Sequence, residues 1–197
     1  MEQSVFVKHQ QLSAFPPAKL AYIIYCRLRE QGLRTTVLWV WDKISRRVLG
    51  VSPHSVSQVQ PLLYVGGQHK RHGLPRMRKW GIQAVVNMRE ESDDAERGLL
   101  LDHYLWLAVT DDHDPTFEEL QRGANFIAEH VAAGHGVYIH CASGVGRAPT
   151  MAAAYLVTTG MTADDAWGVI EQGRPFIRPT PPQLEVIQAF AEHLSAQ

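Results

Sequence analysis

The chain has 197 residues, of which 45% are hydrophobic and 20% are charged, and its formal net charge is −1. This composition suits one globular domain with an extension and excludes a disordered chain, a coiled coil or a collagen-like repeat. The near-neutral charge argues against a nucleic-acid partner, and no apolar run approaches the ~18 residues that cross a bilayer.

The first 50 residues differ in charge from the rest of the chain. They hold eight of the 19 Lys and Arg residues but three of the 20 Asp and Glu residues, so the remainder is acidic. Two helices are predicted here, one from about Pro17 to Gly32 and one from about Thr35 to Leu49. In the second helix five apolar residues fall on one face, namely Val37, Val40, Trp41, Ile44 and Val48.

This basic amphipathic extension, residues 1–54, is predicted to precede a second unit over residues 55–197, with 50–61 as the linker between them. Asp42, Lys43 and Arg46 form a polar face of the second helix. Because most amphipathic helices bury their apolar face in their own protein, we expect that face to pack on the acidic remainder of the chain. The alternative is attachment to an anionic membrane surface or a partner through residues 1–50.

The second unit alternates apolar strand patterns with helical patterns. Strands are predicted at 62–65, 82–88, 104–109 and 136–140, and helices at 74–80, 116–134, 149–158, 162–173 and after 182. Thr116 with Glu119 three residues later forms a capping box at the start of one helix. The alternation favours an α/β fold with a central, mostly parallel sheet flanked by helices, preceded by the N-terminal helical extension.

The segment from His140 to Arg147 carries the candidate chemistry. A buried strand delivers Cys141 to its C-terminal end, which is where open α/β sheets bind ligands. Gly144 and Gly146 then let the backbone curl so that successive N–H groups point inward, and the next helix aims its positive end at the same place. Such a cup suits a phosphate dianion, held by Ala142, Ser143, Gly144, Val145, Gly146 and Arg147.

The residue types at the two ends of this segment predict nucleophilic chemistry. Arg147 offers a planar fork that matches two phosphate oxygens. The same positive field favours the thiolate of Cys141, which becomes an activated nucleophile under a bound phosphate. The alternative for Cys141 is a buried core thiol.

The two cysteines, Cys26 and Cys141, lie far apart in the sequence, so we expect no disulfide scaffold and a reducing compartment. Because the N-terminus also lacks a signal-peptide pattern, the protein is expected to be cytoplasmic, and peripheral at a membrane if the extension binds one. Cys26 has no phosphate-binding setting and is predicted to pack in a core.

His140 to Arg147 resembles the signature loop of the cysteine-dependent protein tyrosine phosphatase superfamily, His-Cys-x5-Arg. The resemblance runs from about Val56 to Phe190. It points to the dual-specificity branch, closest to the mitochondrial phosphatidylglycerophosphate phosphatase type and its bacterial relatives. It implies no metal or organic cofactor, a phosphocysteine intermediate on Cys141, phosphate binding by Arg147 and support of the thiolate by His140.

The resemblance also implies an aspartate general acid on a loop upstream of the cysteine. Asp111, Asp112 and Asp114 cluster there. Aligning the following Pro115-Thr116 with the start of the family's helix favours Asp111, with Asp112 as the alternate. Asp114 is typical of a turn or helix entry.

The chain departs from the family at Ala148, where a Ser or Thr usually follows the arginine. That hydroxyl helps the cysteine leave when water breaks the intermediate, so its absence bears on the second step and not on the first. Ser143 and Thr150 are candidate substitutes. We expect a phosphomonoester hydrolase acting on phosphoprotein or on phosphoinositide or other phospholipid phosphate; the alternative is a slow or inactive phosphate-binding module.

Other polar segments give weaker predictions. Residues 69–72 (His-Lys-Arg-His) are predicted to form a solvated turn, and 89–91 (Arg-Glu-Glu) a charged helix start or the rim of a cleft. Arg174 and Arg178 either contact a substrate beyond its phosphate or pair with surface acids. The histidine pairs at 69/72 and 130/135 have no further ligand nearby in the sequence, so no metal site is predicted.

Overall fold

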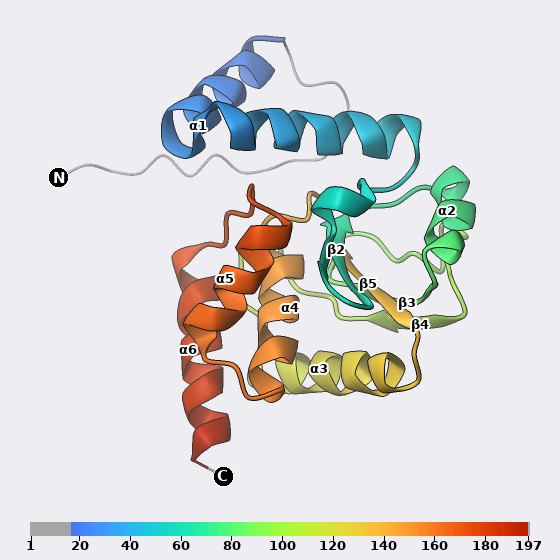
Figure 1. Ribbon diagram of the computed structural model, residues 1–197, viewed down its shortest axis with the longest axis vertical. Helices are drawn as coiled ribbons and strands as arrows, with labels where there is room; N and C mark the ends of the chain where they lie inside the picture. The colour runs from blue at the N-terminus through green and yellow to red at the C-terminus, as the bar shows by residue number, and fades with distance from the viewer. Residues whose placement is uncertain (1–16, 197) are drawn as a thin grey trace, which may run out of the picture.

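A computed structural model describes residues 17–196, in which one sheet is covered by helices on both faces (Figure 1). The strand order is β1-β2-β5-β3-β4, with bounds Gln58–Gln60, Leu63–Gly67, Gly136–Cys141, Ile82–Asn87 and His103–Trp106. β1 runs antiparallel to β2, whereas the β2–β5, β5–β3 and β3–β4 pairs are parallel. The predicted α/β fold with a mostly parallel sheet is confirmed.

Each face of the sheet has its own core. The helices α3 (Phe117–Ala132), α4 (Arg147–Thr158), α5 (Ala163–Gly173) and α6 (Pro181–Ser195) cover one face, and the short α2 (Leu74–Lys79) covers the other. In β5, Val137 and Ile139 pack toward the first core, while Tyr138 packs toward the second. Because both faces of the sheet are covered, its central strands are continuous apolar runs. Such runs are recognisable in the sequence, which is why these strands could be predicted.

Helix starts follow the local capping chemistry. α3 begins at the predicted capping box, in which Thr116 and Glu119 satisfy each other's backbone N–H groups. α4 begins at Arg147, two residues before its predicted start, with Gly146 as its N-cap. Pro149 is tolerated in this first turn because its missing N–H would have no partner there. The earlier start places Arg147 in the first turn of α4.

The segment 50–61, predicted as a linker, is structured. It contains the 3-10 turn η1 (His54–Val56) and the edge strand β1, and Val51 and Ser52 are fully buried. The Ser52 hydroxyl accepts a hydrogen bond from the Gly67 N–H at 3.3 Å. The linker prediction is wrong because a Ser- and Val-rich composition suits a short edge strand as well as a linker. The division at residue 54 stays a prediction.

Helix α1 (Pro17–Val48) lies along one side of the molecule and is kinked at Gly32, whose φ of 80° and ψ of 172° are not helical (Figure 1). The kink separates the two helices predicted on either side of it. Cys26 lies half-buried in the first of them, so the prediction that it packs in a core is wrong. No helix among residues 17–196 is long and apolar enough to cross a bilayer.

The second half of α1 is oriented opposite to the prediction. Val37, Trp41, Ile44 and Val48 are 47–67% exposed, whereas Asp42 and Ser45 are buried. Trp39 anchors the helix on the domain, in a small cluster with Val56 and Phe176. The polar face turns inward because it meets backbone carbonyls and a buried arginine, as the site below shows. The expectation that the apolar face packs on the domain is therefore wrong for Val37, Trp41, Ile44 and Val48, whereas Val40 of that face is partly buried and packs against the Trp39 cluster.

Candidate active site

The candidate site lies where β5 ends and α4 begins. The signature loop, residues 141–147, joins the two, so Cys141 closes the central strand and Arg147 opens the helix. Gly144 has a φ of +68°, and a Cβ there would lie 2.3 Å from the backbone of Gly66 at the end of β2. A side chain at residue 144 would therefore clash with the neighbouring strand, which explains why the loop needs glycine there.

Cys141 is held inside the loop. Its side chain is nearly buried, with 4% of the residue exposed, and the Gly144 N–H donates to its Sγ at 3.2 Å. The N-terminus of α4 lies at the same place and carries the positive end of the helix dipole. A hydrogen-bond donor and a helix N-terminus both stabilise a thiolate more than a thiol.

The carbonyl groups of the loop are held from outside by two arginines. Arg174 donates from Nε to the Gly144 carbonyl at 2.6 Å and from Nη2 to the Ser143 carbonyl at 3.2 Å. Arg46 of α1 donates from Nη1 to the Ala142 carbonyl at 3.1 Å. With these carbonyls held by the arginines, the loop is fixed in the curled form in which the Gly144 N–H points toward Cys141.

Asp42 of α1 joins the two arginines. Its carboxylate lies 2.9 Å from Nε of Arg46 and 3.3 Å from Nη1 of Arg174, and the residue has no exposed surface. Burial raises the pKa of Asp42, but the charges of Arg174 and Arg46 outweigh it and lower that pKa overall. The inner face of α1 is therefore an ionic brace behind the signature loop. Arg174, predicted to contact substrate or surface acids, is part of this brace instead.

Arg147 is buried but not fully paired. Its Nη1 donates to the carbonyls of Val109 and Met88 at 2.7 and 3.2 Å, and both Nη atoms bind the Glu91 carboxylate, at 2.9 and 3.1 Å. Its Nε is buried and has no hydrogen-bond partner in the part of the chain described. The guanidinium is thus fixed in place with one donor to spare.

Two carboxylates face this guanidinium. Glu91 has its pKa lowered to about 2, because hydrogen bonds from Arg147 and Arg89 outweigh the effect of burial, which raises it. Asp111 lies 2.8 Å from Nη2 of Arg147 and is 41% exposed on its side chain. Of the two predicted acids the structure places Asp111 at Arg147. Asp112 is exposed, has a φ of +61°, and its carbonyl accepts a hydrogen bond from Thr180.

His140 belongs to a cluster of buried polar side chains next to the loop. Its Nε2 is 2.8 Å from Asp94, which also accepts a hydrogen bond from Gln68 at 2.8 Å. His69 is fully buried beside them, with its Nε2 2.9 Å from the Leu99 carbonyl. The prediction of a solvated turn at 69–72 is therefore wrong at its first residue. Burial, followed by the neighbouring His140, lowers the pKa of His69 to about 4.

The predicted substitutes for the missing hydroxyl at Ala148 have different settings. Ala148 itself is fully buried. The Thr150 hydroxyl donates to the Gly146 carbonyl at 3.0 Å and is thereby engaged within its own helix. Ser143 is half-buried in the loop. Their role in turnover stays a prediction.

Sequence reasoning missed three residues of this arrangement, namely Asp42, Arg46 and Asp94, and it gave Glu91 no role at Arg147. Glu91 was among the residues considered for the cleft rim, and its position just after β3 was the available signal, because β3 and β5 end at the same sheet edge. Asp42 and Arg46 were assigned to a solvent-facing polar face. Their partners lie about a hundred residues away in sequence, and no local pattern indicates them.

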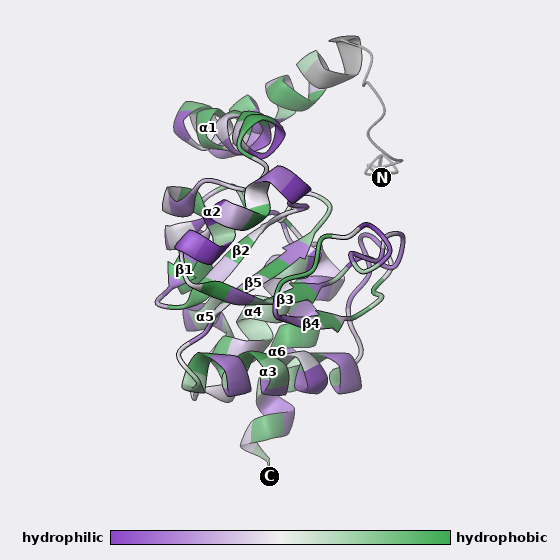
Figure 2. Ribbon diagram, turned by 90° about the vertical axis from the view of Figure 1, so that its right-hand side faces the viewer, coloured by the Kyte–Doolittle hydropathy of each residue, from purple (hydrophilic) through white to green (hydrophobic). Residues whose placement is uncertain are grey.

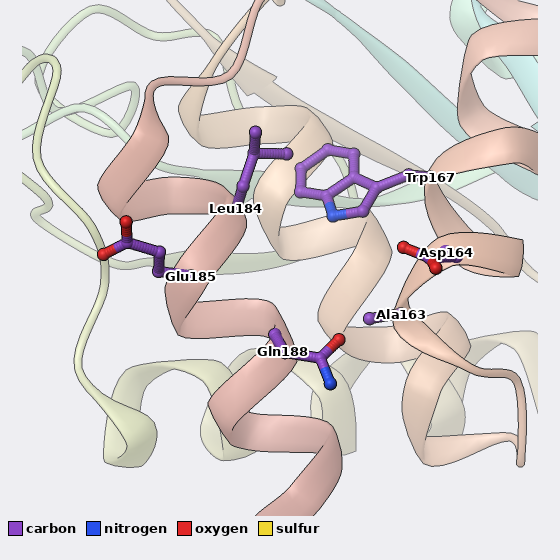
Figure 3. A pocket seen from close by; sticks show the side chains of 6 residues that line it. All are labelled: Ala163, Asp164, Trp167, Leu184, Glu185 and Gln188. Carbon is purple, nitrogen blue, oxygen red and sulfur yellow. The ribbon is translucent and has the colours of Figure 1, made fainter.

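A separate hollow of about 300 Å³ lies between α5 and α6 (Figure 3). Trp167 and Leu184 are the large apolar residues of its lining, and Asp164, Glu185 and Gln188 are the polar ones. None of its lining residues belongs to the signature loop, and it contains no thiol or imidazole. It is therefore not part of the candidate active site.

Comparisons with known proteins agree with the geometry. Residues 63–193 match the family model described as dual specificity phosphatase, catalytic domain. The human phosphatidylglycerophosphatase and protein-tyrosine phosphatase 1 is 34% identical over 84 residues, 42% of each protein. Phosphatidylglycerophosphate phosphatase PTPMT2 of Arabidopsis thaliana is 26% identical over 140 residues, 68% of this chain and 61% of that protein. The chain thus spans less than two thirds of the length of these relatives.

Solved structures show the same fold. The crystal structure of PTPMT1 superposes with a TM-score of 0.63 at 26% identity, covering 71% of this chain and 96% of that one. The crystal structure of human DUSP28 gives a TM-score of 0.65 at 21% identity, covering 72% and 99%. At 21% identity, the similarity to DUSP28 supports the fold and no statement about function.

Proposed function

The chain belongs to the dual specificity phosphatase family, and on this premise we propose that it hydrolyses phosphomonoesters through a phosphocysteine intermediate. One observation carries the proposal. Cys141 Sγ accepts a loop N–H, and the buried Arg147 at the other end of the loop keeps Nε without a partner. A cysteine that accepts a loop N–H, together with an arginine that has one unpaired donor, suits the binding of a phosphate dianion and an in-line attack.

In the first step, phosphate enters the cup and takes the Nε and Nη2 donors of Arg147. Asp111 leaves its ion pair with Nη2, takes up a proton from solvent and turns toward the leaving oxygen as the neutral acid. The Cys141 thiolate attacks phosphorus, an S–P bond forms, and the P–O bond breaks with its electron pair going to the leaving oxygen. Asp111 donates its proton to that oxygen, so the alcohol departs neutral.

In the second step, water attacks the phosphorus of phosphocysteine. The Asp111 carboxylate accepts a proton from the water, the S–P bond breaks, and Cys141 leaves as a thiolate with inorganic phosphate as the product. The Gly144 N–H and the N-terminus of α4 stabilise the departing thiolate. Because Ala148 supplies no hydroxyl here, we expect the second step to be slower than the first.

The test is phosphate release from para-nitrophenyl phosphate by wild type and by Cys141→Ser. Continuous release that Cys141→Ser abolishes is the expected result. Full turnover in Cys141→Ser would exclude the phosphocysteine route. Binding of phosphate without turnover in the wild type would instead favour the alternative, an inactive phosphate-binding module.

For the substrate class we propose a phosphate presented at an anionic membrane surface. The outer face of α1, defined as Val37, Trp41, Ile44 and Val48, is exposed, whereas Trp39 and Arg46 of the same helix contact the domain. Figure 2 shows α1 lying to one side of the sheet and its other helices. Arg34 and Arg47 are exposed on the same half of the helix. Exposed apolar residues with flanking cations favour the interface of anionic lipids.

The names of two relatives support a phospholipid substrate. The plant protein is named a phosphatidylglycerophosphate phosphatase, the human protein is named both a phosphatidylglycerophosphatase and a protein-tyrosine phosphatase, and one PTPMT1 crystal structure is a complex with PI(5)P at 25% identity. The helix also reaches the signature loop through Arg46. A membrane bound to the outer face would therefore lie near the catalytic machinery.

The test is sedimentation with vesicles of phosphatidylcholine, with and without anionic phosphatidylglycerol. Wild type should bind the anionic vesicles, and Trp41→Ser with Ile44→Ser should lose that binding while keeping activity on para-nitrophenyl phosphate. The matched control is Leu184→Ser, an exposed apolar residue on α6. Equal binding by all three proteins would exclude the outer face of α1 as the membrane contact.

A further inference from the structure

Three histidines gather at the sheet edge opposite the signature loop. His103 begins β4, His130 lies in the last turn of α3, and His135 lies in the turn before β5. β5 starts beside this cluster and ends at Cys141. The cluster is therefore separate from the candidate active site and unused by the proposed reaction.

The end of α3 brings two of these histidines together. Gly134 has a φ of +79°, the left-handed conformation that ends many helices. The His135 N–H then donates to the His130 carbonyl at 2.9 Å, the long bond of a Schellman turn. As a result the two Nδ1 atoms lie 3.5 Å apart.

His103 completes the group from a different element. Its ring centroid is 4.3 Å from that of His130 and 5.3 Å from that of His135. One ring nitrogen from each histidine lies within 4.8 Å of the others. Sequence reasoning found the 130/135 pair but no third ligand, because His103 reaches them only through the packing of β4 beside α3.

We propose that His103, His130 and His135 bind a divalent transition metal of the zinc class. Zn–N bonds of ~2.0–2.1 Å place tetrahedral ligand nitrogens roughly 3.4 Å apart, which the His130–His135 pair already matches. Three imidazoles leave a fourth position for water, and the half-exposed His103 and His135 give access from solvent. Phe126 packs edge-on against the buried His130, with 4.4 Å between the ring centroids, and closes the back of the site.

A second buried group, His69, Asp94 and His140, also has three potential ligand atoms together. It is a weaker site because all three residues are fully buried. Two of its nitrogens are also engaged, since His140 Nε2 is 2.8 Å from Asp94 and His69 Nε2 is 2.9 Å from the Leu99 carbonyl, whereas His69 Nδ1 has no hydrogen-bond partner among the described residues. A metal there would have to break both contacts.

The metal would join the start of β4 to the end of α3, so its expected effect is on stability. Because a ligand that binds the folded state stabilises it by mass action, Zn²⁺ should raise the melting temperature. The protein is used without a histidine tag and as Cys141→Ser, since a thiolate is itself a zinc ligand. Calorimetric titration with Zn²⁺ should then show one bound ion per chain.

The discriminating variants are His103→Gln and His135→Gln, with the exposed His72→Gln as the matched control. Each ligand variant should weaken Zn²⁺ binding by more than about 100-fold, the upper range for losing an outer-shell partner, and should abolish the rise in melting temperature. His72→Gln should keep both. His135 lies in a turn, so His135→Gln keeps the test valid if His103→Gln folds poorly.

Three results would overturn the proposal. The first is no Zn²⁺ binding by the parent protein, and the second is unchanged affinity in both ligand variants. The third is loss of binding in His69→Gln with retention in His135→Gln, which would move the metal to the other cluster.

Discussion

Two buried arginines belong to or contact the signature loop, and they differ in how their donors are used: Arg147 ends the loop, and Arg174 binds its carbonyls. Arg174 is saturated: its donors reach the carbonyls of Gly144, Ser143 and Val56, and Asp42 balances its charge. Arg147 is anchored by carbonyls and by Glu91 but keeps Nε without a partner. A buried arginine whose hydrogen-bond donors are all paired stabilises the fold, whereas a buried arginine with an unpaired donor can bind a ligand.

Three groups of variants should therefore behave differently. Changes on the Arg147 side should reduce catalysis with little effect on folding. Changes on the Arg174 side, including its α1 partner Asp42, should reduce stability first. Changes on the outer face of α1 should affect neither.

The largest effect should come from Asp111→Asn, which removes the proposed proton donor. General acid catalysis contributes ~10²–10⁴-fold, so kcat should fall within that range on an alkyl phosphate. The fall should be smaller on para-nitrophenyl phosphate, whose leaving group needs less protonation. Asp112→Asn is the control, and a larger loss there would assign the acid to Asp112.

Arg147→Lys should follow, because it keeps the charge but loses the planar fork. We expect kcat to fall by ~10²–10³-fold, the cost of losing one oxyanion donor. Arg174→Lys should lower the melting temperature more than Arg147→Lys does. Kinetics and thermal melts on both variants measure the contrast, and identical profiles for the two would contradict it.

Asp42→Asn tests the brace. Removing one partner of a buried ion pair costs ~3–5 kcal/mol, because Arg174 and Arg46 are left with uncompensated charge. The control is Glu30→Gln, which breaks the exposed pair of Glu30 and Arg178 and should cost at most ~1 kcal/mol. Urea unfolding measures the free energy of unfolding of both variants. Equal losses would contradict a larger stabilising role for the buried brace.

The same brace predicts a pH dependence. The pKa of Asp42 is lowered on folding, so its contribution to stability is present above its unfolded pKa of ~3.9 and is lost as pH falls through the lower folded value. The stability gap between wild type and Asp42→Asn should therefore be constant near neutral pH and shrink in acid. Urea unfolding at several pH values measures it. A gap that widens in acid would contradict the sign.

The smallest effect on folding should come from Trp41→Ser on the outer face. Trp41 is 47% exposed, so its loss should change stability by no more than ~0.5 kcal/mol. Urea unfolding measures this change. A large destabilisation would mean that the outer face is packed against something in solution.

The sequence predicted the Arg147 side well and the Arg174 side poorly, for a physical reason. Cys141 to Arg147 are contiguous, so strand, glycines, cysteine and helix start are all visible in one segment. The orientation of α1 depends on partners far along the chain. Hydrophobic periodicity identified its apolar face but not the loop carbonyls and Arg174 that draw the polar face inward.

The central claim, a phosphocysteine on Cys141, is tested most directly by trapping it. Wild type is quenched with acid during turnover of para-nitrophenyl phosphate, and its peptides are analysed by mass spectrometry. We predict one phosphoryl group on the peptide that contains Cys141, accumulating because Ala148 leaves the second step slow, and none in Cys141→Ser. Steady turnover in Cys141→Ser, or a phosphoryl group on another residue of the wild type, would contradict the account.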